Sequence, residues 1–209
     1  MQEDTAISPS LIDWGVAWRP LPGQHVCGDM HLVKTLSDGV LLAVVDGLGH
    51  GDEAVVASKT AVRVLESHAE DTLVGLFHRC HIELNRTRGV VMTAAVLHEG
   101  ENRLNWMGVG NVEAVLVHAH RSSRPASERV LLRNGIVGYR LPELRLSSPP
   151  IAPDDLLIFA TDGIGPGFAE GLVLDDPPQR IADRILKRHV KPWDDALVLV
   201  VRYVGSDHE

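Results

Sequence analysis

Aspartates stand next to apolar runs at four separate places in this sequence, each time beside a glycine or a second aspartate. Carboxylates that gather from distant segments repel one another, by about 4 kcal/mol for a pair about 4 Å apart at an effective dielectric constant of about 20. A hard divalent cation relieves this repulsion, because its preferred ligands are carboxylate, carbonyl and water oxygens. The pattern therefore predicts a metal-dependent hydrolase. The four segments are Cys27–Met30, Val45–Gly51, Ala160–Gly163 and Trp193–Ala196.

The segment Asp46-Gly47-Leu48-Gly49-His50-Gly51 is the most specific of the four. It follows the apolar run Val40–Val45, which is typical of a strand buried on both faces, and it precedes apolar residues at helical spacing. A dinucleotide-binding loop would need the spacing GxGxxG, whereas the glycines here follow GxGxG and an acid opens the loop. A purely structural turn would not require an aspartate at the strand end. We therefore interpret Asp46 as a functional residue.

The other three segments are ambiguous when each is taken alone. Asp162-Gly163 is among the commonest turn pairs, and Asp194-Asp195 could simply solvate the start of a strand. Gly28-Asp29 is equally uninformative by itself. The combination carries the weight, because an apolar run again delivers Asp162 to the end of a strand, as it does Asp46.

The hydrophobic periodicity predicts strands followed by two helices, then several antiparallel strands, a late helix and a closing strand. This order is not a βαβ alternation, so it favours an α+β protein in which helices cover antiparallel sheets. Two turn pairs, Asp38-Gly39 and Asn134-Gly135, each predict a hairpin. The expected strands are 11–19, 31–36, 40–45, 90–97, 103–109, 112–117, 130–133, 136–139, 156–160 and 196–203, and the expected helices are 52–69, 72–86 and 178–189.

Composition excludes several classes of protein. The 209 residues suffice for one sizeable core, and the net charge of −8 argues against a nucleic-acid binder, which needs a basic face. No run approaches the roughly 18 apolar residues of a membrane span, and Met1–Asp4 do not resemble the start of a secretion signal. Cys27 and Cys80 are too few for a disulfide framework, so we expect free thiols. We expect a soluble, cytoplasmic protein without nucleic-acid or membrane partners.

Histidine pairs offer a weaker alternative metal site. His78 and His81 lie three positions apart on a predicted helix, and His118 and His120 share one side of a strand end. Neither pair has a third zinc ligand at suitable spacing, so solvated or packed histidines are the simpler interpretation. The segment Arg121–Arg124 is interpreted as a solvated loop, with contact to an acidic partner as its alternative.

Taken in order, these motifs resemble those of the metal-dependent protein phosphatases (PPM, type 2C). The resemblance runs from the first strand to the last, and the compact length with Gly49-His50-Gly51 is similar to the bacterial branch that contains SpoIIE and the RsbX-like stressosome phosphatases. It implies one domain over residues 1–209 with a four-layer αββα sandwich, two central antiparallel sheets flanked by helices. The motifs are Gly28-Asp29, Asp46–Gly51, Thr93-Ala94, Gly108-Val109-Gly110-Asn111, Thr161-Asp162-Gly163 and Asp194-Asp195.

The resemblance also implies a site with two Mn²⁺ or Mg²⁺ ions. Asp46 would bridge both ions, and the carbonyl of Gly47 would contact one of them. Asp162 and Asp194 would hold the other ion, and Asp29 would hydrogen-bond a metal-bound water. These residues would form the catalytic centre of a phosphoprotein phosphatase.

Several positions carry a lesser role or depart from the family pattern. Asp195 and His50 would be accessory residues, while Gly110 and Asn111 would shape the sheet. Leu48 replaces the histidine that follows Asp-Gly in many eukaryotic members, and Ala196-Leu197 replaces the usual serine or threonine after the last aspartates. The arginine that often binds phosphate upstream of Gly-Asp has no counterpart, since Gln24 and His25 occupy that region.

The function implied by the resemblance is hydrolysis of phosphoserine or phosphothreonine on a bacterial signalling protein by a two-metal activated water. The partner implied by the RsbX-like group is a phosphorylated STAS-domain protein of a stressosome. Two alternatives stay open: a catalytically weak binding module with the same fold, and a phosphatase of small phosphorylated metabolites.

Overall fold

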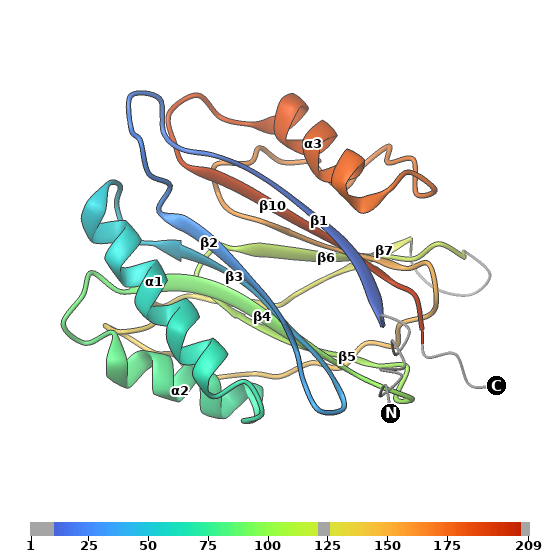
Figure 1. Ribbon diagram of the computed structural model, residues 1–209, viewed down its shortest axis with the longest axis horizontal. Helices are drawn as coiled ribbons and strands as arrows, with labels where there is room; N and C mark the ends of the chain where they lie inside the picture. Colours follow the sequence, from blue (N-terminus) through green and yellow to red (C-terminus); the bar gives the residue numbers. More distant parts are fainter. Residues whose placement is uncertain (1–10, 121–125, 206–209) are drawn as a thin grey trace, which may run out of the picture.

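Two five-stranded sheets stack face to face between helices in the computed structural model, which describes residues 11–120 and 126–205 (Figure 1). Helices α1 (Asp52–Ser67) and α2 (Leu73–Glu83) cover one outer face, and α3 (Pro178–His189) covers the other. The predicted four-layer αββα sandwich is confirmed. All three helices lie where their periodicity placed them, with α1 and α2 shorter than expected by a few residues at their ends.

The strands of each sheet come from separate parts of the chain. The first sheet has the order β1-β10-β9-β6-β7 and the second β2-β3-β4-β5-β8. The first sheet consists of β1 (Ile12–Arg19), β10 (Ala196–Tyr203), β9 (Leu156–Ala160), β6 (Glu113–Val117) and β7 (Ser127–Arg129). The second consists of β2 (Asp29–Thr35), β3 (Gly39–Gly47), β4 (Val90–His98), β5 (Leu104–Val109) and β8 (Leu132–Arg133).

Strand β3 shows why the central strands are apolar throughout. Side chains alternate between the two faces of a strand. Leu42 and Val44 pack in the cluster between the two sheets, whereas Leu41 and Ala43 pack in the cluster under α1 and α2. Both faces of the strand are therefore buried, and only its end, at Asp46, emerges from the core.

The predicted hairpin at Asp38-Gly39 is confirmed, since β2 and β3 pair as antiparallel neighbours. The predicted hairpin at Asn134-Gly135 is wrong. A two-residue Asn-Gly turn needs positive φ at both positions, and in this segment only Gly138 has one, at 101°. Instead, β8 pairs with β5, the one parallel pair between the strands of the described chain, and Val137 bridges to Val90.

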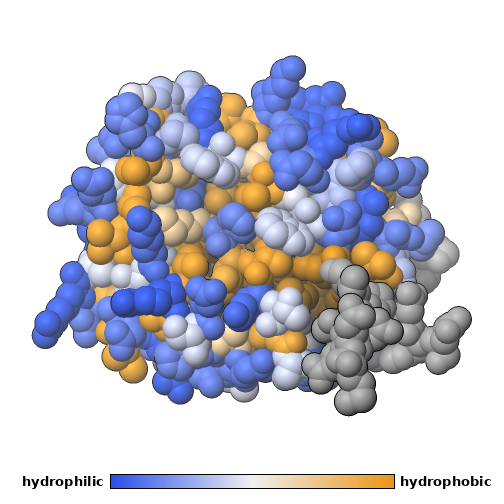
Figure 2. Space-filling model, viewed as in Figure 1, coloured by the Kyte–Doolittle hydropathy of each residue, from blue (hydrophilic) through white to orange (hydrophobic). Residues whose placement is uncertain are grey.

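Apolar side chains gather across the middle of one face, between more polar regions above and below (Figure 2). In the view of Figure 1 this band lies where the two sheets meet. Cys27 and Cys80 are free thiols, as expected. Within residues 11–120 and 126–205, no helix is sufficiently long and apolar to cross a membrane. The segment Arg121–Arg124 lies outside the described residues.

Candidate metal centre and active site

Strands β2 and β3 bring the first two aspartates together. Their antiparallel register places Asp29 directly opposite Asp46. Like charges at directly opposed positions of two strands destabilise a sheet. Nothing in strand pairing requires acids at these positions, so this arrangement points to a ligand rather than to the fold.

Burial disfavours the ionised forms of both carboxylates in addition to their mutual repulsion. Burial raises the pKa of Asp46 to about 9, and the charges of Asp29, Asp162 and Asp194 contribute further. Burial likewise raises the pKa of Asp29 to about 8, although a hydrogen bond from Thr161 opposes the shift. Without a cation the ionised forms of both groups are therefore disfavoured.

The glycines around Asp46 allow the chain to turn sharply into α1. A Cβ on Gly47 would lie 2.2 Å from the carbonyl oxygen of Ala54, so only glycine permits this approach of β3 to the helix. Gly51 caps α1 at a φ of 75°, in the left-handed region that favours glycine. The glycine spacing that excluded a dinucleotide loop thus serves a tight turn between strand and helix.

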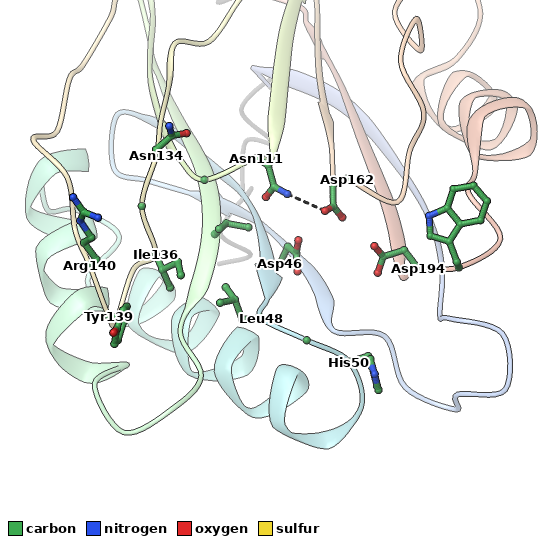
Figure 3. A pocket seen from close by; sticks show the side chains of 15 residues that line it. Asp46, Leu48, His50, Asn111, Asn134, Ile136, Tyr139, Arg140, Asp162 and Asp194 are labelled. Atoms are coloured by element: carbon green, nitrogen blue, oxygen red, sulfur yellow. Dashed lines mark hydrogen bonds between the residues drawn. The ribbon is translucent and has the colours of Figure 1, made fainter.

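Asp162 follows the end of β9 and enters the site from the other sheet. Its neighbour Thr161 donates a hydrogen bond to Asp29 at 2.7 Å and accepts one from the backbone N–H of Leu197 at 2.9 Å. Thr161 thereby fixes β9 and β10 to the end of β2. Asn111 donates from Nδ2 to Asp162 Oδ2 at 2.8 Å, which orients this carboxylate (Figure 3).

The adjacent aspartates before β10 have different roles. Asp194 lines the cavity with Asp46 and Asp162, and burial followed by the charge of Asp162 raises its pKa. Asp195 is 4% exposed and accepts hydrogen bonds from the backbone N–H groups of Leu21 at 2.7 Å and Gly28 at 2.9 Å. Asp195 therefore anchors the loop that leads into Asp29, and it is not among the residues lining the cavity.

A cavity of about 1020 Å³ opens at this end of the sandwich. Asp46, Asp162 and Asp194 converge on it from three separate segments (Figure 3). His50 also lines the cavity, but it is exposed and its ring points away from the acids. The further lining residues are Leu48, Gly49, Val91, Gly110, Asn111, Asn134, Gly135, Ile136, Tyr139, Arg140 and Trp193.

The donor set of the cavity fits Mg²⁺ or Mn²⁺. Mg²⁺ commonly uses one or two carboxylates and keeps several waters, whereas structural Zn²⁺ and Ca²⁺ sites use more protein ligands. Within the described residues no three His, Cys, Asp or Glu side chains form a group that could hold a metal ion. The separated carboxylates of Asp46, Asp162 and Asp194 therefore suit an ion such as Mg²⁺, which takes one or two carboxylates and keeps several waters. The same observation removes both histidine pairs as complete zinc sites.

The histidine pairs instead make structural contacts. Nδ1 of His81 accepts a hydrogen bond from the backbone N–H of Gly138 at 3.0 Å. His118 is buried, and its Nδ1 lies 2.8 Å from a carboxylate oxygen of Asp155. The simpler interpretation of packed histidines holds for these two residues.

Sequence reasoning missed the remaining polar residues of the site. It assigned Asn111 only to the shape of the sheet, although Asn111 contacts Asp162 and lines the cavity. Its position beside Gly110 within the motif was a usable signal. Tyr139 and Arg140 gave no signal, because the chain around them was taken as a hairpin.

A sandwich of two sheets between helices, with aspartates from both sheets at one cavity, defines the type-2C phosphatase class of fold. The profile of the SpoIIE family, described as Stage II sporulation protein E, matches residues 37–204. The chain therefore belongs to this family, and the family predicted from the ordered motifs is confirmed.

Known proteins similar to the chain agree with this assignment. Phosphoserine phosphatase RsbX of Bacillus subtilis (strain 168) is 27% identical over 94 residues, which cover 45% of this chain and 47% of RsbX. The chain thus matches less than half the length of this curated relative.

Two solved structures share the fold over most of the chain. One, described as "The bacterial stressosome: a modular system that has been adapted to control secondary messenger signaling", is 29% identical with a TM-score of 0.82 over 91% of this chain and 99% of its own. The other, the crystal structure of RsbX in complex with magnesium, is 22% identical with a TM-score of 0.80 over 91% of this chain and 94% of its own.

Proposed function

We propose that the chain is a metal-dependent serine/threonine protein phosphatase. The observation that supports this most is the convergence of Asp46, Asp162 and Asp194, from both sheets, on one open cavity. A site of carboxylates alone repels a phosphate ester, so such a site acts on phosphate only when cations occupy it. The crystal structure of a relative in complex with magnesium is consistent with this proposal.

The residues of the chain divide the work of the site between them. Asp46 and the carbonyl of Gly47 would hold the first of two Mg²⁺ or Mn²⁺ ions, and Asp162 and Asp194 would hold the second. Such ions, when bound, lower the pKa of water and neutralise the oxygens of a phosphate ester. The hydrogen bond from Thr161 keeps Asp29 in place. Asp29 would in turn accept a hydrogen bond from a water molecule beside Asp46.

The cavity has room for more than a phosphorylated side chain, which is compatible with a protein substrate. We propose that this substrate is a phosphorylated signalling protein in the bacterial cytoplasm. The similarity to RsbX and to the stressosome structure favours a STAS-domain protein of such a complex. We further propose that residues 1–209 form one phosphatase domain.

Phosphate release from an aryl phosphate and from a phosphoserine peptide tests this proposal. We expect activity with Mn²⁺ or Mg²⁺, none with chelator, and a loss of at least about 100-fold in Asp46→Asn, a size typical of removing one electrostatic contact to a transition state. Asp13→Asn, an exposed change on β1, is the matched control and should retain activity. Metal-independent turnover, or an active Asp46→Asn variant, would contradict the proposal.

A further inference from the structure

The cavity extends well beyond its acidic end. Its opposite wall comes from Asn134, Gly135, Tyr139 and Arg140, and Leu48 and Ile136 lie between the two ends in Figure 3. A phosphate held at Asp46, Asp162 and Asp194 would leave this wall to the polypeptide on either side of the phosphorylated residue. The wall is therefore a candidate surface for recognising the substrate.

The turn that forms this wall is fixed to the core. The backbone of Val137 exchanges two hydrogen bonds of 2.9 Å with Val90 of β4, and Val137 is fully buried. Gly138 donates to His81 on α2, and Ile136 exchanges backbone hydrogen bonds of 2.8 and 2.9 Å with Arg140. The side chains that follow Gly138 are therefore presented from a fixed backbone.

Tyr139 and Arg140, the two residues that follow Gly138, are both exposed. Tyr139 is 81% exposed, more than any other large apolar or aromatic side chain among the described residues. Tyrosine and arginine, together with tryptophan, are enriched among the residues that dominate binding energy in protein interfaces. Two such residues on a rigid turn beside the cavity indicate contact with a partner.

The charge of Arg140 specifies that partner. Among the described residues that line the cavity, it is the only arginine or lysine. Several surface arginines, such as Arg79 and Arg145, pair with acids of the chain, but no such ion pair involves Arg140 within the described residues. Its cationic group is available to an anion, and it lies across the cavity from the acids that would position the phosphate (Figure 3).

We propose that the Tyr139–Arg140 turn binds an acidic residue of the phosphoprotein substrate, separate in sequence from its phosphorylated residue. This inference rests on the proposed function, because that function places the phosphate at the acidic end. The tyrosine ring covers the neighbouring part of the substrate chain while the guanidinium pairs with the carboxylate. The turn thereby selects which phosphorylated segments enter the cavity.

Binding of phosphoserine-mimetic phosphonate peptides in the presence of Mg²⁺ tests this inference. Two peptides are compared. One carries glutamate on both sides of the phosphonate residue, and the other carries glutamine at the same positions. The protein should bind the glutamate peptide about three- to tenfold more tightly, the range expected for a partly exposed charged hydrogen bond. Arg140→Gln should abolish this ratio, and Arg140→Glu should invert it. Tyr139→Ala should weaken the binding of both peptides by a similar factor.

Arg145→Gln is the matched control, since Arg145 pairs with Glu143 and does not line the cavity. It should keep the wild-type ratio. An unchanged ratio in Arg140→Glu, or failure of the protein to bind either peptide, would overturn the inference. The binding assay needs no turnover, so absence of aryl phosphate hydrolysis would count against the proposed function alone.

Discussion

Aspartates of two kinds lie at opposite ends of the sandwich. At one end, Asp155 is 1% exposed and accepts hydrogen bonds from the backbone N–H groups of Ala119 and Ala152, and its carboxylate also contacts the His118 ring. At the other end, Asp29 and Asp46 face each other across two strands with raised pKa values. Only Thr161 donates to Asp29 from a side chain of the described residues.

The number of hydrogen-bond donors distinguishes a structural aspartate such as Asp155 from aspartates such as Asp29 and Asp46, which need a cation to be stable in the ionised form. Backbone N–H donors satisfy the carboxylate oxygens of Asp155 and so compensate for its lost hydration. The donors around Asp29 and Asp46 do not compensate theirs, and their mutual repulsion adds to the penalty. Asp195 belongs to the first kind although it is next to Asp194 in the sequence.

The largest effect should come from Asp155→Asn. Each carboxylate oxygen accepts from one backbone N–H, that of Ala119 or that of Ala152, and an asparagine would place its own NH₂ group against one of these donors. We expect unfolding free energy to fall by about 3 kcal/mol or more, measured by denaturant unfolding, with activity per folded molecule retained. The adjacent Asp154→Asn is the control, because Asp154 is exposed and its φ of 71° suits asparagine. If Asp155→Asn and Asp154→Asn lowered the unfolding free energy equally, Asp155 would not be a structural aspartate.

The metal-free protein should lose stability as pH rises. The pKa values of Asp29 and Asp46 rise from 3.8 to about 8 and about 9 on folding, so the native state retains protons that the unfolded chain releases. Their contribution is fully present below pH 3.8 and is lost as pH rises through the folded values. Each retained proton lowers the unfolding free energy by about 1.4 kcal/mol per pH unit.

Chelator-treated protein should therefore be less stable at pH 8 than at pH 6 in urea unfolding. Saturating Mg²⁺ should flatten this slope, because the ion binds the ionised carboxylates and stabilises the native state by mass action. A slope that is the same with and without Mg²⁺ would mean that the ion does not bind at these groups.

Asp46→Asn should raise the unfolding free energy of the metal-free protein, whereas Asp155→Asn should lower it. In metal-free protein at pH 8 it removes a carboxylate that burial and its neighbours disfavour, so we expect a gain of about 1 to 3 kcal/mol in unfolding free energy. The same variant should lose the stabilisation by Mg²⁺. Destabilisation of the metal-free protein by this change would place Asp46 among the structural acids.

Patterns along the chain predicted the parts of the fold that repeat a simple period. The closing strand 196–203 and the helix 178–189 were predicted to the residue, because their apolar spacing decides their structure. The turn at Asn134-Gly135 was mispredicted because its conformation depends on Val137 bridging to Val90, far away in sequence. The role of Asp195 was equally invisible, since the loop N–H groups that it binds lie more than 160 residues away.

Asn111 provides the smallest and most specific test of the site. Its Nδ2 donates to Asp162, which holds one carboxylate oxygen and leaves the other free for a cation. Mutation of a residue that orients a metal ligand typically lowers metal affinity or activity by 10- to 100-fold. We expect Asn111→Ala to lower the Mg²⁺ affinity by about tenfold, measured by titration calorimetry. Asn85→Ala, an exposed change after α2, should leave the affinity unchanged. Normal affinity in Asn111→Ala would leave Asn111 with only the sheet-shaping role predicted for it from the sequence.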